Sequence, residues 1–151
     1  MTQAVSIGRE AAISIVINGV LSLAFFLGVF GTQPRLLRWG APDQLAQDFV
    51  PQSIAVALMS ALVPSLIVRR KLIRAAVQHA VSLRGILLRA ALFAIAGAGL
   101  GGLLAVSIGG LDVPSIAWGA AMMIKIAYGG ALGALVASLA LRRLLSSARP
   151  V

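Results

Sequence analysis

The chain has 151 residues, of which 60% are hydrophobic and 11% are charged, and its mean hydropathy is +0.99. A soluble domain carries about a quarter charged residues, so this composition excludes an ordinary soluble protein and predicts an integral membrane protein. The net charge of +9 comes from basic residues at the ends of apolar runs, which is typical of membrane proteins and not of nucleic-acid-binding proteins. The length predicts one domain, residues 1–151, and without cysteine the chain has no disulfide or thiolate chemistry.

The first predicted membrane span covers about residues 11–30, a stretch without ionisable side chains. About 20 apolar residues at 1.5 Å per residue match the hydrocarbon core of a bilayer, which is about 30 Å thick. A cleaved signal peptide is the alternative interpretation. Its apolar region would be shorter and would end in a small-residue cleavage pattern, so we expect the segment to be retained as a span.

A polar stripe follows one face of this span, because its residues recur every four positions: Glu10, Ser14, Asn18 and Ser22. Asn18 would lie in hydrocarbon unless it faces another helix. Hydrogen bonds between helices, worth about 0.6–2 kcal/mol each, are one explanation of the stripe. The other explanation is that it lines a pathway through the membrane.

Residues 31–48 are predicted to form an outer loop, since Pro34, Gly40 and Pro42 interrupt helix there. The second span covers about residues 49–68 and should be capped at its start by Asp48. Pro64 lies inside this span and removes one backbone hydrogen bond, so we expect a kink.

Residues 69–89 form a basic connector in which apolar and polar residues alternate with a helical period, which predicts an amphipathic helix. It either lies along the membrane surface or continues the second span into the cytoplasm. His79 is expected to be a solvated residue on its polar side. The basic residues expected to contact anionic lipid headgroups are Arg69, Arg70, Lys71, Arg74, Arg84 and Arg89.

The third and fourth spans cover about residues 90–111 and 117–141, joined by a short outer loop at 112–116. Each span contains a GxxxG motif, Gly97–Gly101 in the third and Gly129–Gly133 in the fourth. Small residues at this spacing let helix backbones approach closely, which is a main route to helix association in lipid. The motifs therefore predict helix packing within the chain or between chains.

The distribution of charge predicts the orientation of the spans. Basic residues gather in the connector and near the C-terminus, so these parts and the N-terminus should be cytoplasmic. Trp39 and Trp118 then lie at the opposite interface, which amphipathic aromatic side chains prefer. The sequence thus predicts an all-α bundle of four transmembrane helices in a bacterial inner membrane, with both termini inside.

Lys125 is predicted to lie about 10 Å inside the fourth span, where a cation costs about 2–3 kcal/mol unless it is paired or reaches the interface. It could form a substrate or anion site or act as a proton-coupled group, or it could extend outward and pair with Asp48 or Asp112. Tyr128 lies one turn further along nearly the same face. We hypothesise that one outward-facing cavity between the second and fourth helices is lined by Asp48, Gln52, Lys125 and Tyr128.

The predicted orientation argues against an enzyme, because the histidine and the outer aspartates are separated by the membrane. No metal-ligand spacing is present, and we expect no cofactor. The main hypothesis is a non-enzymatic membrane component that forms homo-oligomers or binds another membrane protein through its glycine-rich helices. The alternative is a small oligomeric transporter or channel with its site around Lys125, and a lipid-acting enzyme is the least supported class.

Overall fold

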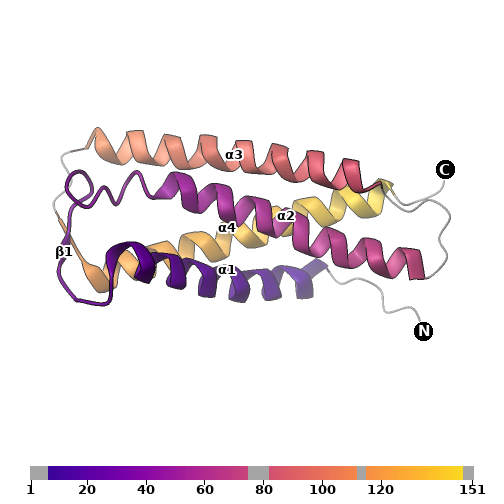
Figure 1. Cartoon of the computed structure of the whole chain (residues 1–151), viewed down its shortest axis with the longest axis horizontal. Coiled ribbons are helices and arrows are strands. Elements are labelled where there is room, and N and C mark those ends of the chain that lie inside the picture. Colours follow the sequence, from indigo (N-terminus) through magenta and orange to yellow (C-terminus); the bar gives the residue numbers. More distant parts are fainter. Residues whose placement is uncertain (1–6, 75–81, 112–114, 148–151) are drawn as a thin grey trace.

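The computed structural model describes residues 7–74, 82–111 and 115–147, and these form four long helices. The helices are α1 (Ile7–Phe30), α2 (Phe49–Arg74), α3 (Leu83–Gly109) and α4 (Trp118–Ser147). All four run along the long axis of the molecule (Figure 1). Each is long and apolar enough to cross a membrane, which suggests a multi-pass membrane protein.

The helices pack in two close pairs, α1 with α4 and α2 with α3. The pairs are joined mainly through α2 and α4, whereas α1 and α2 touch over only a short length. Apolar side chains fill the contact between the pairs, including Val56, Ala57, Leu132 and Val136. The thin contact between α1 and α2 leaves an opening that matters for the candidate site.

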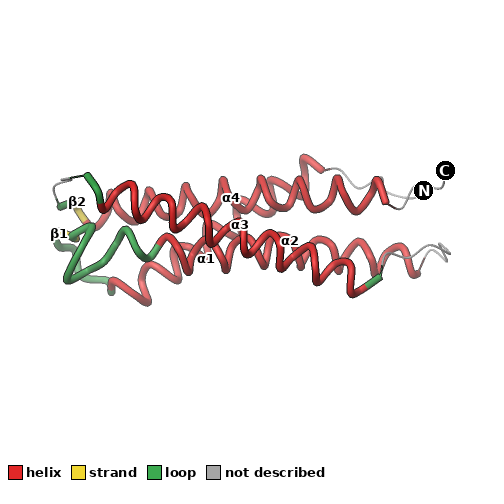
Figure 2. The backbone as a smooth tube through the Cα atoms, turned by 90° about the horizontal axis from the view of Figure 1, so that it is seen from above, coloured by secondary structure: helices red, strands yellow, loops and turns green. Residues whose placement is uncertain are grey.

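A small sheet, not predicted from the sequence, joins the α1–α2 and α3–α4 loops at one end of the molecule (Figure 2). Strand β1 (Leu36–Leu37) pairs antiparallel with β2 (Ile116–Ala117). The indole nitrogen of Trp118 also donates a hydrogen bond to the Gly31 carbonyl, 3.1 Å away. We call this the β end, and the opposite end, where the described arginines of α2, α3 and α4 and Lys71 gather, the basic end.

The helices continue past the apolar runs that predicted the spans, and for α2 this continuation is one of the two alternatives expected for the connector. The second helix extends beyond residue 68 to Arg74, and the third begins at Leu83 instead of residue 90. Ser82 caps α3, since its hydroxyl accepts a hydrogen bond from the Gly85 amide. The fourth helix continues to Ser147, beyond residue 141. Of the predicted connector, residues 69–74 belong to α2 and residues 83–89 to α3, whereas residues 75–81, which include His79, lie outside the described residues.

The outer surface of the helices is apolar. Large exposed side chains along α1 and α3 include Val16, Val20, Leu88, Ile95, Leu103 and Val106. Only 11% of the most apolar stretch of α3 is buried, so most of this helix faces outward. Such a surface would be unstable in water and is the surface expected of helices in lipid.

The glycines of α3 determine how closely α2 and α3 pack. A Cβ atom added to Gly97 would lie 2.7 Å from the Ser53 carbonyl oxygen, and one added to Gly101 would lie 2.6 Å from that of Phe49. These neighbours are backbone atoms of α2 and cannot rotate away. The Gly97–Gly101 motif is therefore used within the chain, on the face of α3 that is buried against α2.

Candidate functional site: a polar line inside the helices

Lys125 is fully buried in α4 and forms an ion pair with Asp48. The ammonium nitrogen lies 2.7 Å from Asp48 Oδ2, and the two side chains are 1% and 10% exposed. The ammonium also lies 4.0 Å from the centre of the Phe49 ring, a cation–π contact. Lys125 is not exposed at the surface, and it pairs with Asp48, one of the two aspartates named as its expected partners.

Gln52 connects α2 to both α4 and α1. Its side-chain nitrogen donates to the Lys125 carbonyl and to Ser22 Oγ, each 2.9 Å away. Gln52 and Ser22 are 2% exposed, so these hydrogen bonds are formed in the interior. The ion pair is thereby linked to the polar stripe of the first helix.

Tyr128 packs beside this site but uses a different partner. Its hydroxyl lies 2.6 Å from Ser53 Oγ, and its ring makes an edge contact with Phe49 at 5.0 Å between centres. Asp48, Gln52, Lys125 and Tyr128 thus converge as hypothesised. Lys125 and Gln52 are buried there, at 1% and 2% exposed.

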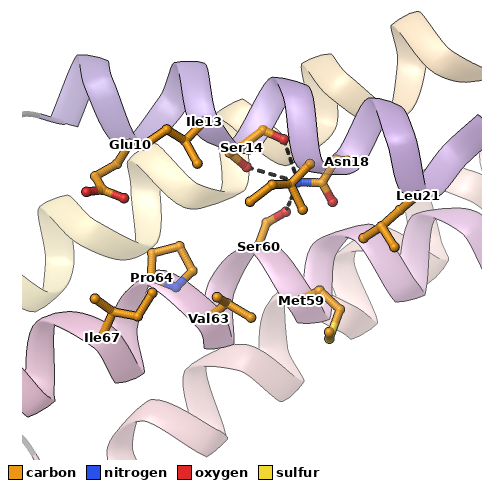
Figure 3. Close-up of a pocket in the computed structure, with 11 residues that line it drawn as sticks. Glu10, Ile13, Ser14, Asn18, Leu21, Met59, Ser60, Val63, Pro64 and Ile67 are labelled. Atoms are coloured by element: carbon orange, nitrogen blue, oxygen red, sulfur yellow. Dashed lines mark hydrogen bonds between the residues drawn. The ribbon is translucent and has the colours of Figure 1, made fainter.

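The stripe on α1 continues toward the basic end. The Asn18 side-chain nitrogen donates to the Ser14 carbonyl at 2.8 Å, to Ser14 Oγ at 3.0 Å and to Ser60 Oγ of α2 at 2.9 Å (Figure 3). Ser14, Asn18 and Ser60 are at most 5% exposed. The stripe therefore forms hydrogen bonds between helices, and Ser60 is a partner that the sequence pattern did not reveal.

The second GxxxG motif makes room for this stripe. A Cβ atom added to Gly129 would overlap Ser22 Oγ, and one added to Gly133 would overlap the Asn18 amide. The two glycines of α4 thus create niches that polar side chains of α1 occupy. Because a niche is filled from the same chain, the Gly129–Gly133 motif is not a free surface for a second copy.

Together these groups form a polar line through the interface of α1, α2 and α4. In order from the β end, we define the polar line by Asp48, Lys125, Gln52, Ser22, Asn18, Ser60, Ser14 and Glu10. Asp48 lies at the start of α2, and Glu10 lies in the first turns of α1 at the other end. The line therefore extends over most of the length of the helices.

Two amide oxygens of the polar line have no hydrogen-bond partner in the described structure: Asn18 Oδ1 and Gln52 Oε1. Their orientation is fixed, because each side-chain nitrogen donates to a backbone carbonyl that can only accept. Exchanging oxygen and nitrogen would place two acceptors together. A buried acceptor without a donor costs about 1–3 kcal/mol, so both positions favour a further binding partner.

A crevice between α1 and α2 is lined in part by Asn18 and Gln52, the residues that carry these two oxygens. One part, of about 90 Å³, extends from Glu10 and Ile67 past Asn18 to Leu21 and Met59 (Figure 3). A second part, of about 160 Å³, is also lined by Leu21 and Met59 and includes Gln52. Because they share these two residues, we treat them as one opening and call it the α1–α2 crevice.

The loop at the β end is held by Asp43. Its carboxylate accepts a hydrogen bond from the Arg38 amide at 2.8 Å and pairs with Arg35 at 2.6 Å. The hydrogen bond from the Arg38 backbone, opposed in part by burial and aided by Arg35, lowers the pKa of Asp43 below its ordinary value. This loop carries Asp48 into position at the start of α2.

The predicted headgroup residues lie at the basic end. Arg70, Lys71, Arg74 and Arg84 are exposed, while Arg69 and Arg89 are partly buried. Arg89 lines a small cavity with Ser65 between α2, α3 and α4. In the part of the chain that the structure describes, no group of three or more histidine or acidic residues could hold a metal ion.

Comparisons with protein-family models, with curated proteins and with solved structures find no match for this chain.

Proposed function

We propose that the protein is a small, non-enzymatic, proton-coupled transport protein of the bacterial inner membrane, with both termini in the cytoplasm. The observation that carries this proposal is the ion pair between the fully buried Lys125 and Asp48, whose side chain is 10% exposed, at the head of the polar line. Ionisable groups inside membrane spans are costly, and they mark ion pathways and proton relays when they pair in the interior.

The polar line supplies what such a pathway needs. Carboxylates occupy its two ends, Asp48 near the β end and Glu10 near the basic end, and hydroxyl and amide groups lie between them. Hydrogen-bonding groups of this kind can pass a proton when water enters the α1–α2 crevice. In this proposal Lys125 and Asp48 form the charged site at the outer end of the polar line.

The charge of the basic end supports the proposed orientation and the proposed contact with lipid headgroups. The basic end carries the exposed arginines and lysine that would contact anionic lipid headgroups in the cytoplasmic leaflet. The natural chain has no cysteine, so single-cysteine variants labelled from either side of the membrane give a clean test. We expect a cysteine at Gln44 to be labelled from outside and one at Arg142 from inside.

The function is tested by proton uptake into vesicles of phosphatidylethanolamine and phosphatidylglycerol that contain a pH-sensitive dye. A potassium diffusion potential, negative inside, provides the driving force. We expect the wild-type protein to acidify the vesicles faster than empty vesicles do, and Lys125→Met to abolish the difference. Met123→Trp, at an exposed position of the same helix, should retain it. Uptake no faster than in empty vesicles, or unchanged by Lys125→Met, contradicts the proposal.

A role as a component of a larger membrane complex is the second candidate. It is favoured by the outer face of α3, where Gly99 and Gly102 have open space beside them and could admit a partner helix. Isolation in a mild detergent with determination of the mass of the complex tests this role. A heteromer that is lost in Gly99→Leu supports it, and a homo-oligomer or monomer unchanged by this variant argues against it.

A further inference from the structure

We propose that the α1–α2 crevice binds an amphiphile with a hydrocarbon chain and a polar group that donates hydrogen bonds, such as a long-chain alcohol or amine. This inference rests on the proposed transport function and names its substrate class. The molecule would enter sideways from the bilayer, with its donor group on the polar line and its chain along the crevice walls.

The walls of the crevice are suited to a hydrocarbon chain. They are formed mainly by Ile13, Ile17, Leu21, Met59, Val63 and Ile67, which come from both helices. The crevice is open on its outer side, where Ile13, Met59 and Ile67 are more than 40% exposed. From Glu10 to Leu21 it follows α1 for eleven residues, about 16 Å at 1.5 Å per residue, which is about half of a bilayer core.

The floor of the crevice requires a donor. Asn18 and Gln52 are 3% and 2% exposed, and their unpartnered oxygens accept hydrogen bonds only. In Figure 3 the Asn18 oxygen points away from Ser14 and Ser60, on the side of Leu21. An alkyl chain alone would leave both oxygens without partners. The Glu10 carboxylate at the basic end of the crevice also favours a group that donates hydrogen bonds.

A second copy of this chain fits the crevice less well. The exposed side chains along the middle of the described helices are hydrocarbon, glycine or methionine, apart from Ser107 near the β end of α3. A second copy would therefore cover the walls without supplying donors at the depth of Asn18. The two unpartnered acceptors select a ligand that carries its own O–H or N–H group.

The test uses two photoactivatable probes in vesicles of phosphatidylethanolamine and phosphatidylglycerol that contain the full chain. One probe is a hexadecanol with a diazirine in its chain, and the other is its methyl ether, which has the same chain and no donor. Labelled peptides are identified by mass spectrometry. We expect the alcohol to label α1 and α2 beside the crevice about fivefold more than the ether does, the ratio expected for one hydrogen bond. A hexadecylamine probe should label the same peptides.

A matched pair of variants separates the crevice from the general lipid surface. Met59→Trp fills the crevice and should lower labelling by the alcohol to the level of the ether. Met123→Trp makes the same change on the exposed face of α4 and should not alter labelling. Equal labelling by alcohol and ether, or labelling of the α3 outer face as strong as that of α1 and α2, overturns the inference, as does wild-type labelling in Met59→Trp.

The outcomes distinguish this inference from the proposed function. If proton uptake depends on Lys125 while the crevice is not labelled, the substrate class is wrong and the transport proposal stands. If the crevice is labelled as expected while proton uptake equals that of empty vesicles, the transport proposal is wrong and the crevice is a lipid-binding site.

Discussion

The two helix pairs use the same motif for different purposes. In the α2–α3 pair, the Gly97–Gly101 motif brings two backbones together, and the nearest atoms to each glycine belong to the main chain or to small side chains of α2. In the α1–α4 pair, the Gly129–Gly133 motif makes space for Ser22 and Asn18. A GxxxG motif thus indicates a close approach, but not whether backbone or polar side chains fill the space it provides.

The largest effect is expected when the α1–α4 pair loses Lys125, the buried cation of the polar line. Lys125→Met leaves the Asp48 carboxylate buried without its partner and should lower the free energy of unfolding by about 3–5 kcal/mol. Thermal unfolding in detergent, followed by circular dichroism, measures the loss. The double variant Lys125→Met with Asp48→Asn should recover most of it. A double variant as unstable as the single one would show that the pair is not the source of the effect.

A smaller loss is expected from Gly101→Ala in the α2–α3 pair. The new methyl group would meet the Phe49 carbonyl and the Val50 Cα, and the helices must separate to admit it. We expect a decrease of about 1–3 kcal/mol in the free energy of unfolding. Gly102→Ala is the matched control, because nothing lies within 4 Å of its added Cβ. Equal unfolding temperatures for the two variants would disagree with backbone contact at Gly101.

Gly129→Ala should cost less than Gly101→Ala, since the atom it overlaps is a side-chain hydroxyl that can rotate. The expected loss is about 1 kcal/mol, the net value of the Gln52–Ser22 hydrogen bond that the rotation disrupts. Removing the hydroxyl with Ser22→Ala should make Gly129→Ala less costly, which a double-mutant cycle measures. Additive losses of stability in that cycle would contradict the inference that Ser22 occupies the space beside Gly129.

The smallest effect concerns acid. The pKa of Asp43 is lower in the folded protein than in the unfolded chain, so its contribution to stability is present above the unfolded value of about 3.9 and is lost as the pH falls through the folded value. We expect tryptophan fluorescence to report loosening of the β end in this acidic range. Asp43→Asn should remove the pH dependence, and an identical acid transition in this variant would assign it to another group.

The sequence predicted the features that depend on local pattern. Four long apolar runs predicted four helices, and the spacing of four residues placed Ser14, Asn18 and Ser22 on one face. Asp48, Gln52, Lys125 and Tyr128 were proposed as one site from their depth alone, and they lie together. Depth was sufficient because the spans of a membrane protein run roughly parallel, so residues at the same depth on different spans lie at the same level of the bundle.

Other features depend on which helices become neighbours, and the sequence carries no local signal for this. Ser60 is one serine in an apolar helix, and only the approach of α1 makes it a partner of Asn18. The pairing of Leu36 with Ala117 joins loops far apart in the chain. Helices α2 and α3 extend past the predicted spans because basic residues end an apolar run without ending a helix, and lysine and arginine are good helix formers.

The most direct measurement is proton uptake by the double variant Lys125→Met with Asp48→Asn. Its unfolding temperature is measured first and must equal that of the wild type. This variant lacks both charges of the ion pair and leaves no unpaired charge in the interior. It therefore separates an effect on transport from an effect on folding. The account predicts a stable protein whose vesicles acidify no faster than empty ones. Uptake at the wild-type rate by this stable variant would show that the Lys125–Asp48 pair is structural and that protons do not pass along the polar line.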